Sequence, residues 1–185
     1  MIKDLGQRFI ITYYKFLARF GLRPAPVSIF EQISQANHVL LCLPNAVNGS
    51  LDQILRVNAF KEIFPKAKIT LLYNSDTMTS KGWTKPYQSL QYQKDQLSTL
   101  GLPPKSLKAD VLKSHFDIAI DLSLSFNFIN TSIIWASKAS LMIGFNHPLR
   151  DELYNFLIRI KSGETQENSY NSLFRYLGAG TIKAT

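Results

Sequence analysis

Three polar side chains stand where apolar runs of the sequence end. Asp121 lies near the end of the run 116–122, and His147 and Arg150 follow the run 141–145. Ligands of open α/β sheets bind at the carboxyl ends of the strands, so these residues are candidates for ligand contact. A carboxylate can accept a sugar hydroxyl or act as a base, whereas an imidazole or guanidinium suits a phosphate or carboxylate. Asp121 is equally suited to cap the helix that follows it, so both roles stay open.

A loop of small residues, 45–50, follows the first apolar run, 39–43. Within it, Asn48, Gly49 and Ser50 can present backbone N–H groups at a helix N-terminus, which is a natural site for an anion. The Ser50 hydroxyl also suits the N-cap of that helix. An ordinary turn between a strand and a helix uses the same residue types, so the sequence leaves the two interpretations equal.

Two lysines, Lys81 and Lys85, lie in a turn-rich loop after the second apolar run, 69–73. They suit an anionic ligand, although a solvated loop would carry the same residues. The glycine signatures of dinucleotide-binding and P-loop proteins are missing, and the three histidines are scattered. We therefore expect no cofactor and no metal.

Apolar runs alternate with segments of helical pattern along the chain. This alternation predicts an α/β fold, a Rossmann-like doubly wound sheet that is mostly parallel. The segment 151–160 fits either a helix or a strand. The expected strands are 39–44, 68–74, 116–122 and 141–145, and the expected helices are 50–63, 85–100, 126–135 and 169–177.

The N-terminal region, residues 1–26, is predicted to be a basic amphipathic helix that ends before Pro24 and Pro26. Two interpretations stay open: the helix lies on an anionic membrane with its aromatic side down, or it packs on its own domain with a solvated basic edge. The basic stripe comprises Arg8, Thr12, Lys15, Arg19 and Arg23, and the apolar side comprises Phe9, Ile10, Tyr13, Phe16, Leu17 and Phe20.

Composition restricts the partners. The formal charge of +8 and the isoelectric point near 9.6 favour phosphorylated sugars, nucleic acid or an anionic membrane. Nucleic acid is not expected, because the basic residues are dispersed and no recognition motif is present. No apolar run is long enough to span a bilayer, and there is no signal peptide. We expect a cytoplasmic protein, either free or peripheral on the inner membrane face.

Three stretches of sequence share their order and spacing with one enzyme family. The first is Leu40–Asn45 with Gly49 and then FKEIFPKAKITLL; the second is FDIAIDL, followed by an apolar helix, SKA and IGF; the third is ENSYNSLFRYLG. Together they resemble the N-terminal half of the family 9 glycosyltransferases, the ADP-heptose:lipopolysaccharide heptosyltransferases. The resemblance covers residues 38 to 180.

This resemblance implies the acceptor-side half of a two-domain GT-B fold, here over residues 38–180. The acceptor would be a lipid-linked or phosphorylated sugar of the lipopolysaccharide core, and Lys81, Lys85 and Arg150 would correspond to the family's basic acceptor contacts. A nucleotide sugar would bind only through a C-terminal donor domain that this chain lacks, with residues 181–185 as the start of a linker.

The family also has an aspartate beside the glycine of its first loop, proposed as the base that deprotonates the acceptor hydroxyl. The matching position here is Ser50 or Gly49, and neither side chain can be that base. No catalytic residue is therefore assigned. Two hypotheses remain: the acceptor-binding half of a glycosyltransferase that acts on lipopolysaccharide, or a catalytically inactive binding module at the membrane surface.

Overall fold

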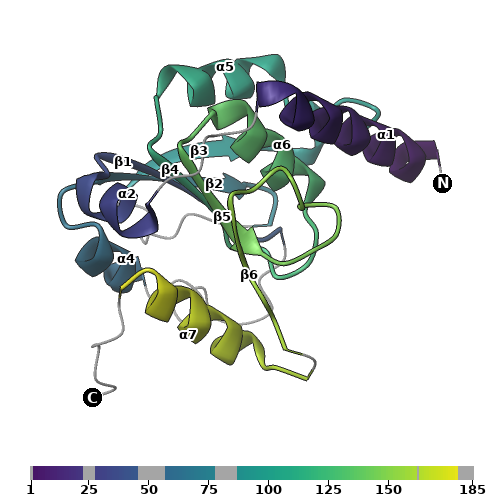
Figure 1. The fold of residues 1–185 in the computed structure, drawn as a ribbon. Coiled ribbons are helices and arrows are strands. Elements are labelled where there is room, and N and C mark those ends of the chain that lie inside the picture. Colours follow the sequence, from purple (N-terminus) through teal and green to yellow (C-terminus); the bar gives the residue numbers. More distant parts are fainter. Residues whose placement is uncertain (1, 23–27, 46–56, 78–86, 162, 179–185) are drawn as a thin grey trace.

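The computed structural model describes residues 2–22, 28–45, 57–77, 87–161 and 163–178. Its described strands form one sheet in the order β3-β2-β1-β4-β5-β6 (Figure 1). Every neighbouring pair of these strands is parallel. The strands are β1 (His38–Cys42), β2 (Lys68–Asn74), β3 (Gln88–Tyr92), β4 (Ile118–Asp121), β5 (Leu141–Phe145) and β6 (Phe156–Ile158).

The strand order contains one reversal of direction across the sheet. The chain builds outward from β1 through β2 to β3, then returns to place β4 on the other side of β1 and continues to β5 and β6. This is the doubly wound, Rossmann-like arrangement that the sequence predicts, with parallel pairing throughout the described sheet. The reversal lies between β1 and β4, and such a switch point is where open α/β sheets bind ligands.

Helices cover both faces of the sheet (Figure 1). Successive residues of a strand point to opposite faces, so Val39 and Leu41 join one apolar cluster while Leu40 and Cys42 join the other. The first cluster includes residues of α4 and α7, and the second includes residues of α1, α5 and α6. The helices are α1 (Ile2–Leu17), α2 (Ile29–Gln35), α4 (Val57–Ile63), α5 (Lys105–Lys113), α6 (Phe128–Ser137) and α7 (Gln166–Tyr176).

Two of these helices begin at side-chain caps. The Asn127 carboxamide oxygen accepts hydrogen bonds from the backbone N–H groups of Ile129 and Asn130, both at 3.1 Å, at the start of α6. The Thr165 hydroxyl accepts one from the N–H of Asn168 at the start of α7. Such bonds satisfy donors that the first helical turn leaves unpaired. The cap of α6 also fixes the end of the loop between β4 and α6.

Most of the predicted elements are confirmed. Strands 68–74 and 141–145 have the predicted bounds, and the other two strands begin within two residues of the prediction. The ambiguous segment 151–160 contains β6, a strand of three residues. Of the predicted helix 50–63, the described part is helical from Val57, and the Ser50 cap lies outside the described residues.

The prediction of a helix over 85–100 is wrong. This region contains β3 and a short 3-10 helix, Lys94–Gln96. β3 is an edge strand, so its polar residues face solvent and only Leu90 and Tyr92 turn inward, which leaves little apolar alternation to detect. Helix α5 was not predicted either, because only Leu107 and Val111 of its nine residues are buried.

The N-terminal helix forms as predicted and packs on its own domain. Ile11 and Ala18 are the buried contacts, with Ala18 in a π-helical turn, Ala18–Leu22, that follows α1. The aromatic side that the sequence predicts for this helix stays largely exposed, as described below. None of the described helices combines the length and apolar character that a bilayer crossing requires.

Candidate functional site

A cleft of about 470 Å³ opens at the carboxyl edge of the sheet, at the switch point between β1 and β4. Pro44 and Asn45 follow β1 on one side, and residues 123–127 connect β4 to α6 on the other. Gln7 of α1 and Gln166 of α7 complete its walls. The volume suits a ligand of the size of a mono- or disaccharide unit, since small-molecule sites begin at about 300 Å³.

The polar groups that line the cleft are neutral. Among the described lining residues none carries a charge, and the apolar part is formed by residues such as Phe126 and Phe128. Amides and hydroxyls both donate and accept hydrogen bonds, which matches a ligand with many hydroxyl groups. The polar lining consists of four amides and three hydroxyls: Gln7, Asn45, Asn127, Gln166, Ser123, Ser125 and Tyr170.

Several of these groups are held in place by hydrogen bonds. The Tyr92 hydroxyl donates to the Asn45 carboxamide oxygen at 2.5 Å, and the Tyr170 hydroxyl donates to the Leu122 carbonyl at 2.6 Å. Burial raises the pKa of both phenols, so both remain protonated donors. The Gln7 amide donates to the Leu100 carbonyl at 3.0 Å, which ties α1 to the wall of the cleft. Anchored polar groups of this kind make a pre-organised site.

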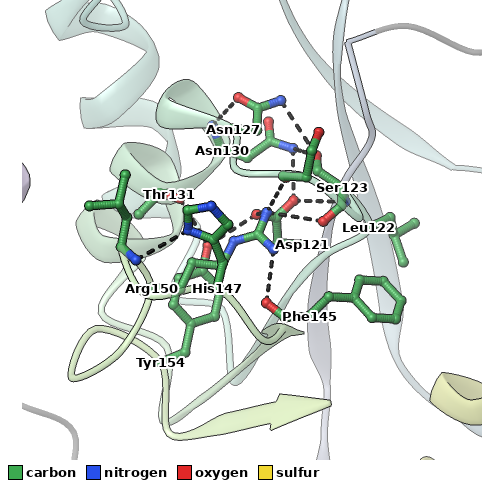
Figure 2. Close-up of polar contacts among 12 residues, drawn as sticks. Asp121, Leu122, Ser123, Asn127, Asn130, Thr131, Phe145, His147, Arg150 and Tyr154 are labelled. Atoms are coloured by element: carbon green, nitrogen blue, oxygen red, sulfur yellow. Dashed lines mark hydrogen bonds and ion pairs between the residues drawn. The ribbon is translucent and has the colours of Figure 1, made fainter. Parts of the chain in front are cut away.

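A buried ion pair lies beneath the cleft. The Arg150 guanidinium and the Asp121 carboxylate meet at 2.8 Å, and both side chains have 0% exposure (Figure 2). An unpaired charge here would carry a large desolvation cost, so each partner requires the other. Asp121, at the end of β4, thereby fixes a residue that follows β5.

Arg150 also clamps the loop that forms one rim of the cleft. Its guanidinium donates to the carbonyls of Ser123 and Ser125, at 3.0 and 2.8 Å, and to the carbonyl of Phe145 at 2.9 Å. One side chain therefore joins the β4–α6 loop to the end of β5 (Figure 2). The planar guanidinium suits this role because its donors have a fixed geometry.

Asp121 completes the network from the other side. Its carboxylate accepts hydrogen bonds from the Ser123 N–H, the Asn130 amide and the Tyr154 hydroxyl, at 3.0, 3.0 and 3.2 Å. Burial and then the Asp121 charge raise the pKa of Tyr154, so its phenol remains a donor. Asn130 also donates to the Leu43 carbonyl at 2.9 Å. The network thus connects the ends of β1 and β4, the two strands that frame the cleft.

His147 lies in the next loop and supports the same rim. Its ring stacks on Phe126, with centroids 5.2 Å apart, and its Nδ1 accepts the N–H of Leu149 at 3.1 Å. Partial burial and the charge of Arg150 lower the pKa of His147, so the ring is held in its neutral form. Phe126 lines the cleft directly, whereas His147 acts behind it.

The residues predicted from the sequence fall into two groups. Asp121, His147 and Arg150 come together at one edge of the sheet. However, Asp121 at the end of β4 and Arg150 after β5 form a buried ion pair, not an exposed site. Their contact with a ligand stays a prediction, and the structure adds a supporting position beneath the cleft. The remaining predicted residues, Asn48, Gly49, Ser50, Lys81 and Lys85, lie outside the described residues.

Several lining residues were not predicted. Asn45 opens the loop 45–50 that the sequence marks for chemistry, so its position at the end of a strand was a usable signal. Gln7 and Gln166 come from helices at opposite ends of the chain, and no local pattern connects them. Within the described ranges, no cluster of three histidine, cysteine or acidic side chains is arranged to hold a metal ion.

Comparison with known families gives one match to a family model. The model, described as "Family of unknown function (DUF6913)", matches residues 32–179, which covers the whole sheet and excludes α1. A search of curated protein sequences gave no match.

Solved structures similar to this chain include two glycosyltransferases. A glycosyl transferase family 9 protein from Veillonella parvula DSM 2008 superposes with a TM-score of 0.60 at 16% identity, over 82% of this chain and 43% of that chain. E. coli heptosyltransferase WaaC with ADP has a TM-score of 0.49 at 12% identity, over 80% of this chain and 48% of that one. The first likeness shows a shared, glycosyltransferase-like fold. The chain spans less than half the length of either protein.

Proposed function

The chain belongs to the DUF6913 family, a family of unknown function, and we propose that its domain binds a glycosyl acceptor in the cleft between β1 and β4. In this proposal the domain is the acceptor side of a sugar transfer from a nucleotide donor, and the acceptor is a sugar of the lipopolysaccharide core type. The donor would be held by a second domain. The fold shared with a family 9 glycosyltransferase and the three sequence stretches that resemble that family support this assignment.

The observation that carries the proposal is the neutral lining of the cleft. Amides and hydroxyls supplied by the segment after β1, the β4–α6 loop, α1 and α7 surround one cavity at the switch point. A polyhydroxylated ring can exchange hydrogen bonds with such groups while its C–H face packs on Phe126 or Phe128. A strongly anionic ligand would need positive charge, and the described lining supplies none. A phosphorylated acceptor would therefore depend on residues such as Lys81 and Lys85.

Transfer would require an acceptor hydroxyl to attack the anomeric carbon of the donor, with a base to take the proton and positive charge to stabilise the leaving diphosphate. The described lining contains no carboxylate and no imidazole. The proton acceptor must come from another part of the chain or from another polypeptide.

This same observation favours a second candidate function, a binding module that holds a glycosyl ligand without catalysis. Ser50 or Gly49 occupies the position where the related family has its aspartate, so the usual base is missing from the sequence as well. The two candidates share the cleft and the ligand class. They differ in whether a further sugar is transferred to the sugar bound in the cleft.

A binding experiment tests the shared part. We would titrate the chain with a panel of neutral and phosphorylated mono- and disaccharides by calorimetry, and repeat the titration with Gln166→Trp, which places a bulky ring in the cleft. Asn171→Trp is the matched control, since Asn171 is also exposed on α7 but does not line the cleft. We expect binding that Gln166→Trp abolishes and Asn171→Trp retains. Absence of binding across the panel would contradict the proposal.

A turnover experiment separates the two candidates. The chain would be supplied with a nucleotide sugar, a ligand identified by the titration and the donor domain of a family 9 glycosyltransferase. Release of nucleoside diphosphate above the level without the chain favours transfer. Binding without such release favours the non-catalytic module.

A further inference from the structure

The outward side of α1 carries a stripe of large apolar side chains. Their relative exposures lie between 53% and 75%, although residues of this size are normally buried when they gather on one side of a helix. We call this set the outer stripe of α1: Leu5, Phe9, Tyr13 and Phe16 of α1, and Phe20 of the π-helical turn that continues it.

The stripe is exposed although the helix itself is firmly packed. On the opposite side, Ile11 is 1% exposed, and Tyr14 stacks on Trp135 of α6 with ring centroids 5.9 Å apart. Gln7 is bonded to the Leu100 carbonyl, as described above. The helix lies along the outside of the α5–α6 layer (Figure 1). The outer stripe therefore faces away from the domain, and the described part of the chain offers nothing to cover it.

Basic residues border the stripe along one side. Arg8, Lys15 and Arg19 follow one another at intervals of seven and four residues, which places them on one edge of the helix. Arg8 is exposed, the Lys15 amine donates to the Pro148 carbonyl at 2.6 Å, and Arg19 is paired with Glu152. A cationic border next to exposed aromatic groups matches the two layers of an anionic lipid surface, charged headgroups above acyl chains.

We propose that α1 docks flat on an anionic lipid surface, with the outer stripe inserted between the lipids and Arg8 at the headgroups. The formal charge of +8 on the whole chain favours the same partner. Phenylalanine and tyrosine suit the boundary between headgroups and acyl chains, and the helix can lie in that plane without crossing the bilayer.

Docking of α1 would also bring the opening of the cleft close to the membrane. The meaning of this closeness for sugar binding rests on the proposed function. Gln7 lines the cleft from the inner side of the same helix, so the opening would lie within about one helix diameter, roughly 10 Å, of the headgroups. A lipid-borne sugar could then enter without leaving the membrane. The docking itself does not depend on what the cleft binds.

Vesicle co-sedimentation of the full chain tests the docking. The two probes are vesicles of phosphatidylcholine and vesicles of phosphatidylcholine mixed with an equal part of phosphatidylglycerol. We expect binding to the mixed vesicles that weakens with added salt, and at most weak binding to the neutral ones. The double variant Phe9→Ser with Phe16→Ser should bind at least about tenfold more weakly, because it removes two inserted rings.

Phe30→Ser is the matched control, since Phe30 is 76% exposed but lies on α2 in the other layer of the fold. It should bind like the unchanged chain, and circular dichroism should show all variants folded. Arg8→Glu should reduce binding to the mixed vesicles alone.

Three results would overturn the proposal. The first is equal binding to both vesicle types or to neither, and the second is a double variant that binds as well as Phe30→Ser. The third is an oligomer that the double variant dissociates, because the stripe would then be an interface between copies of this chain. None of these results would bear on sugar binding by the cleft.

Discussion

Two regions depart in opposite ways from the usual sorting of side chains. One is the outer stripe of α1, and the other is the buried network beneath the cleft, which we call the floor: Asp121, Asn130, Arg150 and Tyr154. The floor buries the ion pair of Asp121 and Arg150 completely, whereas the stripe leaves rings such as Phe9 in solvent. The buried charges are explained inside the chain, because Arg150 has carbonyl and carboxylate partners. The exposed rings have no such explanation in the described structure. A polar group buried with its partners indicates positioning, and an apolar group exposed without them indicates an external partner.

The largest expected effect concerns the buried pair. Arg150→Met would leave the Asp121 carboxylate buried without its cation, and we expect a loss of about 3–5 kcal/mol in the free energy of unfolding, measured by urea denaturation. Arg159→Met is the control, because Arg159 is exposed, and it should change stability by less than about 0.5 kcal/mol.

A double variant sharpens this result. Asp121→Asn combined with Arg150→Met removes both charges, so it should be less destabilised than Arg150→Met alone. Equal losses in the single and the double variant would mean that packing, and not charge pairing, explains the role of Arg150.

The second prediction compares the two sides of α1. Ile11→Ala should cost about 2–5 kcal/mol, because it opens a cavity under a side chain that is 1% exposed. Phe9→Ala, on the outer stripe, should change stability by less than about 0.5 kcal/mol although it removes more atoms. Thermal unfolding followed by circular dichroism measures both. A large loss in Phe9→Ala would show that the stripe is covered by the chain itself.

The third prediction concerns a close approach within the floor. A Cβ on Gly144 of β5 would lie 2.9 Å from Cε1 of Tyr154, the ring that donates to Asp121. Gly144→Ala should therefore displace Tyr154 and destabilise the domain by about 1–3 kcal/mol. Tyr154→Phe should cost less, about 1 kcal/mol, since it keeps the ring and loses only the hydroxyl, which contacts Asp121 at 3.2 Å and Thr131 at 3.4 Å. If Gly144→Ala were neutral by urea denaturation, the floor would be less tightly packed than the structure indicates.

The smallest expected effect is a pH dependence from His147. Burial, followed by the charge of Arg150, lowers the pKa of this imidazole in the folded state, while Asp151 acts in the opposite direction. The unfolded chain therefore takes up this proton at higher pH than the folded chain. The stabilisation is fully present above the ordinary imidazole pKa and is lost as the pH falls through the lowered folded value. Urea denaturation between about pH 7 and about pH 5 should show a smaller decline in His147→Gln than in the unchanged chain. An equal decline in both would contradict this assignment.

Sequence reasoning predicts the centre of this fold better than its edges. The strands β2 and β5 have the predicted bounds, because strands buried on both faces produce continuous apolar runs such as ITLLY and LMIGF. The sequence predicts a helix where β3 lies and gives no signal for α5, since both face solvent and carry few buried residues. Burial leaves a pattern in the sequence, and partial exposure removes it.

The edge of the sheet at which the cleft lies was predictable, but the lining residues were not. The sequence predicts that Asp121, His147 and Arg150 meet at this edge, because polar residues after apolar runs meet at one edge of a parallel sheet. They do meet there, but none of them lines the cleft, and their contact with a ligand stays a prediction. Their burial was not predictable, because it depends on Tyr154, Asn130 and the β4–α6 loop, which arrive from separate elements. For α1, the sequence separated an aromatic from a basic side, but only the packing of Ile11 shows which side meets the domain.

The central claim is that the cleft at the switch point is the ligand site. Backbone amide shifts of the isotope-labelled chain, recorded during titration with a saccharide that binds by calorimetry, test it most directly. We predict shift changes at Asn45, at residues 123–127 and at Gln166, with little change near Arg159, which follows β6 and lines a different pocket. Changes confined to another surface, with the cleft amides unmoved at saturation, would contradict the account.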